Sequence, residues 1–175
     1  MANTYTIIAS NTLSSSAASV TFSSIPATYT DLVLRISARA NGSGLLAGLA
    51  IKFNGSTTSI YSNTNLFAYS SSGTSNRSSS VASIPAMDNI TDGGATANSF
   101  SSNELYIPSY TISQNKPSSL FSVVENKSAT NFEWLVYTGA GLYRDTAAIS
   151  SIALTTNAGS FVSGSSFFLY GIKNS

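Results

Sequence analysis

Apolar and polar residues alternate along much of the chain, and this period-two pattern predicts β-strands with one buried face. Clear alternation occurs at 32–39, 49–53, 132–137 and 167–172. Shorter runs predict further strands at 5–8, 20–22, 105–107, 120–124 and 152–154. Together these segments predict roughly nine or ten short strands separated by turn residues.

Turn residues and glycines refine this prediction. Asn54-Gly55 favours a tight type I′ turn, so we expect a hairpin there with a return strand over 59–69. Gly42, Gly44 and Gly48 disfavour a helical turn at 45–49. We therefore expect a single domain over residues 1–175 with an all-β fold, an antiparallel two-sheet sandwich that in its most specific form is a jelly roll.

Two segments of small polar residues predict loops. Residues 70–80 are almost entirely Ser, Gly, Thr and Asn around Arg77, and residues 88–98 include Asp92-Gly93-Gly94. Long solvent-facing loops without specific chemistry are the favoured interpretation. The alternative is a contact surface for neighbouring subunits or for a receptor.

The composition supports strands and argues against a nucleic-acid partner. Only 9% of the residues are charged, against about 25% in soluble domains, and Ser, Thr, Asn and Gly take their place. The formal net charge is +1 and the basic residues are scattered, whereas a nucleic-acid binder concentrates positive charge. So small a net charge also gives little repulsion between copies, which favours self-association.

Several function classes lack the residues they need. The chain has no Cys and no His, which excludes thiolate metal sites and Ser–His or Cys–His catalysis. The seven acidic residues are isolated in sequence, so a glycosidase pair of carboxylates is disfavoured. We therefore expect no enzyme activity and no cofactor. The sequence has no signal-peptide pattern and no apolar run of about 18 residues, so we expect synthesis in a cytoplasm and no membrane partner.

One segment has the oxygen ligands that a hard cation such as calcium prefers. It is Asp88-Asn89-Ile90-Thr91-Asp92-Gly93, which lacks the alternating acids and the closing glutamate of an EF-hand loop. A turn is therefore the favoured interpretation, and no metal is expected.

Aromatic residues are the remaining candidates for a contact site. Trp134 lies in a strongly alternating run, so a core position is favoured over a binding platform. Tyr137, Tyr143 and Arg144 flank Gly139-Ala140-Gly141, which suggests a loop tip that could carry a contact patch. Arg77, in the predicted loop 70–80, is a further candidate.

The last strand has apolar residues on both faces. Phe167 and Leu169 share one face, and Phe168, Tyr170 and Ile172 share the other. One face can enter the core, and the second then needs a cover from loops or from another subunit. Phe168 and Tyr170 are therefore candidate contact residues, and an oligomer is the simpler prediction. Gly171 in this strand predicts a bulge or a close approach of another segment.

An ordered set of phrases resembles a family of small bacteriophage virion proteins and tail-fibre domains known mainly from aquatic phages. The phrases are SIPATYTDLVLR at 24–35, IKFNG at 51–55, ELYIPSY at 104–110, AISSI at 148–152, GSFVSGS at 159–165 and LYGI at 169–172. The resemblance covers nearly the whole chain. It implies a β-sandwich of the virion, often trimeric, in capsid decoration or tail appendages, and it supplies no catalytic residues.

Two functions follow as expectations. The first is a capsid decoration (cement) protein that trimerises and binds the major capsid protein on the capsid exterior; the absence of a shaft segment favours it. The second is a tail-fibre or receptor-binding module that contacts tail proteins and recognises a glycan of the host surface. Either would be made in the bacterial host cytoplasm and act on the virion. A glycan depolymerase is a third, disfavoured alternative.

Overall fold

The computed structural model describes residues 4–69, 72–124 and 135–173, which form strands and turns and contain no helix. In chain order the strands are β1 (Tyr5–Thr12), β2 (Ser19–Phe22), β3 (Asp31–Ser37), β4 (Leu46–Phe53), β5 (Tyr61–Tyr69), β6 (Ser72–Val81), β7 (Ile84–Thr91), β8 (Ser102–Ile107), β9 (Lys116–Val123), β10 (Leu135–Tyr143), β11 (Ile152–Thr156) and β12 (Ser166–Ile172). The predicted Trp134 and the start of its strand lie outside the described residues.

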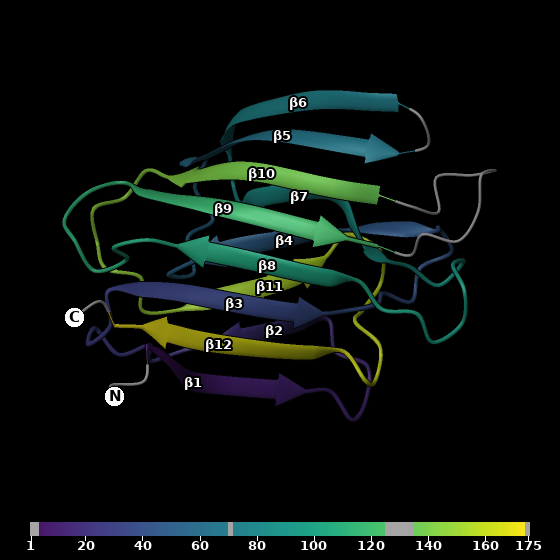
Figure 1. The fold of residues 1–175 in the computed structure, drawn as a ribbon, viewed down its shortest axis with the longest axis horizontal. Helices are drawn as coiled ribbons and strands as arrows, with labels where there is room; N and C mark the ends of the chain where they lie inside the picture. The colour runs from purple at the N-terminus through teal and green to yellow at the C-terminus, as the bar shows by residue number, and fades with distance from the viewer. Residues whose placement is uncertain (1–3, 70–71, 125–134, 174–175) are drawn as a thin grey trace.

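The strands form two antiparallel sheets that pack face to face (Figure 1). The large sheet has eight strands in the order β1-β12-β3-β8-β9-β10-β5-β6, and the small sheet has four in the order β2-β11-β4-β7. The expected all-β, antiparallel two-sheet sandwich is therefore confirmed. The jelly roll stays a prediction. That fold has eight strands in two Greek keys, whereas the described residues form twelve strands.

Alternation places the core between the sheets. On the central strands of the large sheet, Leu34, Leu105 and Leu169 point inward and are fully buried. Ile51, Phe53 and Leu154 of the small sheet lie in the same buried cluster. Each such side chain contributes about 1.5–3 kcal/mol through removal from water, so this layer is the main source of stability.

The Asn54-Gly55 turn forms as predicted, but it does not make the expected hairpin. Both residues have positive φ, at 53° and 64°, and the Ser56 amide donates to the Phe53 carbonyl. β4 belongs to the small sheet and β5 to the large one, so the chain crosses between sheets here. The two turn residues determine the local geometry of the turn. They do not determine which strand β5 pairs with, because that depends on packing against residues far away in sequence.

The expected loop at 70–80 is wrong, because Ser72–Val81 is strand β6. It pairs with β5 from Ser72↔Tyr69 to Val81↔Tyr61 and forms one edge of the large sheet (Figure 1). Backbone hydrogen bonds to β5 hold this segment as a strand, although its small polar side chains are also typical of a loop. The expected loop at 88–98 is correct only from Asp92 onward, since 88–91 complete β7.

Gly171 confirms the prediction of a close approach. A Cβ atom at this position would lie 2.3 Å from the Tyr29 ring, so only glycine lets this ring cover β12. A bulge occurs in the neighbouring strand β1, where the pairing with β12 shifts between Ile7 and Ala9.

Candidate binding surface

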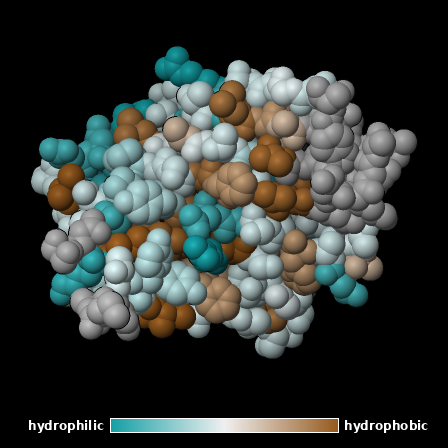
Figure 2. Space-filling view, viewed as in Figure 1, coloured by the Kyte–Doolittle hydropathy of each residue, from teal (hydrophilic) through white to brown (hydrophobic). Residues whose placement is uncertain are grey.

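The outward face of the large sheet exposes large apolar side chains. Tyr5, Ile7, Leu66, Phe121 and Val136 are between 50% and 59% exposed, and all five lie on strands of this sheet. A sheet face that only meets water normally carries polar residues at such positions. Figure 2 shows this face, on which brown apolar patches lie around a teal polar centre.

Strand register places these side chains in transverse rows. The central row runs Ser10, Phe168, Arg35, Glu104, Phe121, Thr138, Leu66 and Ser75 across the sheet. The adjacent row runs Ile7, Tyr170, Val33, Tyr106, Ser119, Ala140, Thr64 and Arg77. Residues in a row lie about 4.8 Å apart from strand to strand, so neighbouring members are in reach of one another.

A charged pair occupies the middle of the face. The Arg35 Nη2 and Glu104 Oε2 atoms are 3.1 Å apart, and both side chains remain largely in water. A solvent-exposed pair of this kind contributes about 0–1 kcal/mol to stability. Beside it lies a hollow of about 400 Å³ that Phe121 and Phe168 help to line.

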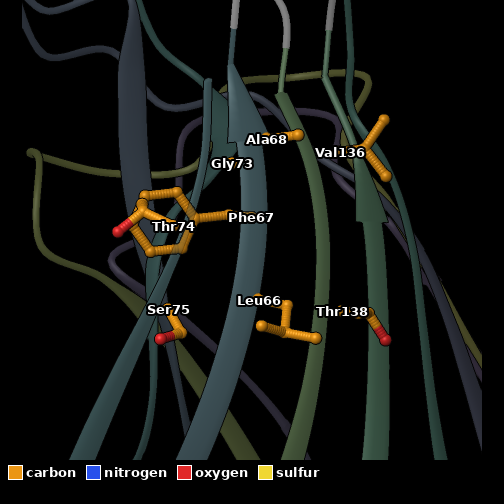
Figure 3. A pocket seen from close by; sticks show the side chains of 8 residues that line it. All are labelled: Leu66, Phe67, Ala68, Gly73, Thr74, Ser75, Val136 and Thr138. Atoms are coloured by element: carbon orange, nitrogen blue, oxygen red, sulfur yellow. The ribbon is translucent and has the colours of Figure 1, made fainter. Parts of the chain in front are cut away.

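A second hollow lies over β10, β5 and β6. It has a volume of about 440 Å³ and is lined by Leu66, Phe67, Ala68, Gly73, Thr74, Ser75, Val136 and Thr138. Figure 3 shows Leu66 of β5 with Val136 and Thr138 of β10 around it. The lining combines the aliphatic side chains of Leu66, Ala68 and Val136 with the ring of Phe67, a mainly apolar set that suits contact with a protein.

The sequence candidates Phe168 and Tyr170 lie on this face and are half-buried. Tyr170 makes an edge-on contact with the Tyr5 ring, at 6.4 Å between centroids. Arg77, expected in a loop, lies on the outward face of β6 beside a polar hollow of about 250 Å³ that includes Thr64. Three of the predicted contact residues are therefore on one surface.

Tyr137 and Tyr143 are placed differently from the expectation. Gly139–Gly141 lies within β10 rather than at a loop tip, and both tyrosines point inward and are 1% exposed. Burial raises the pKa of each phenol well above its usual value. Two buried tyrosines cannot form a contact patch, so this prediction is wrong for both.

Arg144 follows β10 and has a structural role. Its guanidinium donates to the Ser59 carbonyl at 3.1 Å, and its backbone amide donates to the Ile60 carbonyl. These bonds hold the segment before β5 against the end of β10.

Side chains of the acidic segment at 88–93 accept hydrogen bonds from backbone amides of strand β4 and of the loop before it. Asn89 Oδ1 accepts from the Leu49 amide at 2.9 Å, and Asp92 Oδ2 accepts from the Gly44 amide at 3.0 Å. Among residues 4–69, 72–124 and 135–173, no three His, Cys, Asp or Glu side chains form a group that could hold a metal ion. The side chain of Asp88 lies outside what the structure describes.

Two buried cations stabilise loops, and the sequence did not predict either. The Arg39 guanidinium donates to the carbonyls of Gly93, Ala95, Thr96 and Ser99. The Lys116 ammonium donates to the carbonyls of Ile112, Gln114 and Thr146, and burial lowers its pKa. Arg39 binds carbonyls 54–60 residues away, and Lys116 joins two nearby carbonyls to that of Thr146, 30 residues away, contacts that no local pattern reveals.

Comparisons of the chain with protein-family models, with curated proteins and with solved structures gave no match. Within the described residues, no helix has the length and apolar character to cross a membrane. The class that the fold and its exposed face define is a β-sandwich with an apolar sheet surface.

Proposed function

We propose that the chain is a structural protein of a bacteriophage particle, a capsid decoration protein that oligomerises and binds the capsid surface. The observation that carries the proposal is the outward face of the large sheet. Its apolar side chains are exposed although the core between the sheets is complete without them. An exposed apolar patch of this kind is typical of a surface that another macromolecule covers.

The fold and the composition of the chain also support this proposal. An antiparallel sandwich is the fold that the resemblance to phage virion proteins implies, and that resemblance also implies a trimer. The low charge of the chain suits dense packing on a particle, because neighbouring copies repel each other little. Binding is then the whole activity.

We assign the capsid contact to the hollow around Leu66 and Val136. Its lining is mainly apolar, with Leu66, Phe67, Ala68 and Val136 beside small polar residues, as in the centre of protein–protein interfaces. The partner is the major capsid protein on the exterior of the particle.

Co-sedimentation of the purified protein with capsids that lack it tests this assignment. The Leu66→Asp variant should lose capsid binding, because it places a charge in the apolar contact. Ile112→Asp is the matched control, since Ile112 is also an exposed aliphatic residue but lies in a loop. Normal binding by Leu66→Asp, or cryo-electron microscopy density confined to the tail, would contradict the proposal.

A glycan-binding tail module is the second candidate, and the hollow beside Arg77 favours it. This hollow is lined by Ser62, Asn63, Thr64, Arg77, Ala140, Gly141 and Leu142, which offer hydroxyl, amide and guanidinium groups to a sugar. A glycan array with the wild type and Arg77→Ala tests it. Arginine-dependent binding of a host glycan would favour the tail module over capsid decoration.

A further inference from the structure

The central row of the outward face has a symmetric pattern of side-chain types: two aromatic residues flank two residues of opposite charge. Across β12, β3, β8 and β9 its members are Phe168, Arg35, Glu104 and Phe121. The order is therefore aromatic, positive, negative, aromatic. Such a row is complementary to a reversed copy of itself.

We propose that two copies of this chain associate face to face about a two-fold axis that runs parallel to the strands between β3 and β8. This rotation turns each row over onto its own copy. Arg35 then faces Glu104 of the second copy, and Phe121 faces Phe168 of the second copy. A two-fold contact forms each of these pairs twice. The inference goes beyond the proposed function, because it is centred on β3 and β8, although the paired strands reach β10, which carries Val136 and Thr138 of the hollow around Leu66.

The adjacent row is compatible with the same rotation. Tyr170 faces Ser119 of the second copy and Ile7 faces Ala140, whereas Val33, which lies opposite Tyr106, is already buried within its own chain. No like charges oppose each other among these members of the two rows. Because twisted sheets cross at about 30° when they pack, the match is expected near the axis and not across the whole sheet.

The area of the face fits a weak dimer. Three strands lie on the β3 side of the axis, so the paired region extends over the six strands from β1 to β10. At about 4.8 Å per strand and about 3.3 Å per residue, this region measures about 29 Å by about 23 Å, or about 670 Å². A standard interface buries about 800 Å² per partner, so we expect dissociation in the micromolar range.

The charges of Arg35 and Glu104 favour a second copy of this chain as the molecule that covers this face. In one chain the Arg35–Glu104 pair lies in water and contributes little. In the dimer, four alternating charges meet at the axis with aromatic rings on both sides, which fixes the register of the two sheets. A partner of unrelated sequence would not require this symmetric arrangement.

Charge reversal and exchange test the proposal by sedimentation equilibrium. The wild type should form a dimer, and Arg35→Glu or Glu104→Arg alone should weaken it at least about tenfold, because like charges then meet twice. The double variant Arg35→Glu/Glu104→Arg should restore the dimer. Arg77→Glu is the matched control: it reverses the same charge on the same face, but β6 lies beyond the paired strands.

Several outcomes would overturn the inference. They are a monomer at every concentration up to about 100 µM, a double variant as weak as the single ones, or a trimer that Arg35→Glu leaves intact. Circular dichroism of each variant confirms that the fold is retained. A wild type that stays monomeric but binds capsids contradicts this inference alone, whereas a wild-type dimer that does not bind capsids contradicts the proposed function alone.

Discussion

The two ends of the large sheet are held in different ways. At β12, β3 and β8 the inward residues are apolar apart from Asn103 of β8, and they pack on the small sheet. At β9, β10 and β5 the inward face includes Ser118, Gly139 and Asn65, and β6 extends beyond β7 (Figure 1). The first end is stabilised by burial of apolar side chains. The second end buries the rings of Tyr61, Tyr137 and Tyr143 together with these polar groups, and its edge strand β6 is held by backbone pairing.

The polar end also leaves hydrogen-bonding groups without partners. Among the described residues, Asn65 Nδ2 and Ser118 Oγ are buried and have no partner. Buried groups of this kind cost about 1–3 kcal/mol each when unpaired. The difference teaches that a strand can be ordered in the sheet without contributing much to its stability.

The largest expected effect is a truncation at the apolar end. Leu34→Ala removes a fully buried side chain from β3 and should lower the free energy of unfolding by about 2–5 kcal/mol. Leu66→Ala, on the outward face of β5, should change it by less than about 0.5 kcal/mol. Urea denaturation measures both, and similar losses would remove the contrast between the ends.

Alkaline pH should destabilise the fold through buried tyrosines. Burial raises the pKa of Tyr61, Tyr110, Tyr137 and Tyr143 above the unfolded value of about 10. Their contribution is complete below about pH 10 and is lost as the pH rises through the folded pKa values, with a slope of about 1.4 kcal/mol per pH unit for each proton. The lowered pKa of Lys116 acts in the opposite direction, but it is one group against four.

Thermal unfolding between pH 9 and 11 measures this loss. Tyr137→Phe should reduce the slope, because that side chain no longer ionises. A stability that stays constant through this range would contradict the assignment of these phenols to the folded interior.

At the polar end, glycine is required inside β10. A Cβ at Gly141 would lie 2.7 Å from Ser118 Oγ and 3.0 Å from Ile84 Cδ1, so Gly141→Ala should cost about 1–3 kcal/mol. Ser118→Ala in the same background should recover part of this cost. Gly73→Ala on β6 is the control, since a Cβ there meets nothing within 4 Å and should be tolerated.

The charged pair is also expected to have only a small effect on stability. Arg35→Ala should change the free energy of unfolding by less than about 1 kcal/mol, because both partners are exposed. Denaturation below the dissociation constant of the dimer isolates this term. A larger loss would show that the pair supports the fold itself.

The strands with apolar alternation were predictable, and so were the turn at Asn54-Gly55 and the close approach at Gly171. These features follow from adjacent residues or from a period of two. The strand β6 was not predictable, because its small polar residues are also the composition of a loop. The apparent loop tip at Gly139–Gly141 misled for a related reason: these glycines make room for Asn65 and Ser118, which are far away in sequence.

The binding surface was predictable in part. Phe168 and Tyr170 could be identified because their strand is apolar on both faces. Only one face can enter the core, so the other must lie on the surface or be covered by another segment. For the strands of Leu66, Phe121 and Val136, the sequence alone does not distinguish the outward face from the inward one. The row that joins Arg35 to Glu104 depends on the pairing of β3 with β8. Register between distant strands carries this information, and it has no local signal.

The serine-rich strand β6 has a consequence for evolution and engineering. Gly73, Ser75, Arg77 and Ser79 point outward and are exposed, and their neighbours hold the register mainly through the backbone. Substitution at these positions should therefore cost the fold little stability, while the core strands are constrained. The same freedom makes β6 a place where a short recognition sequence could be displayed without rebuilding the sandwich.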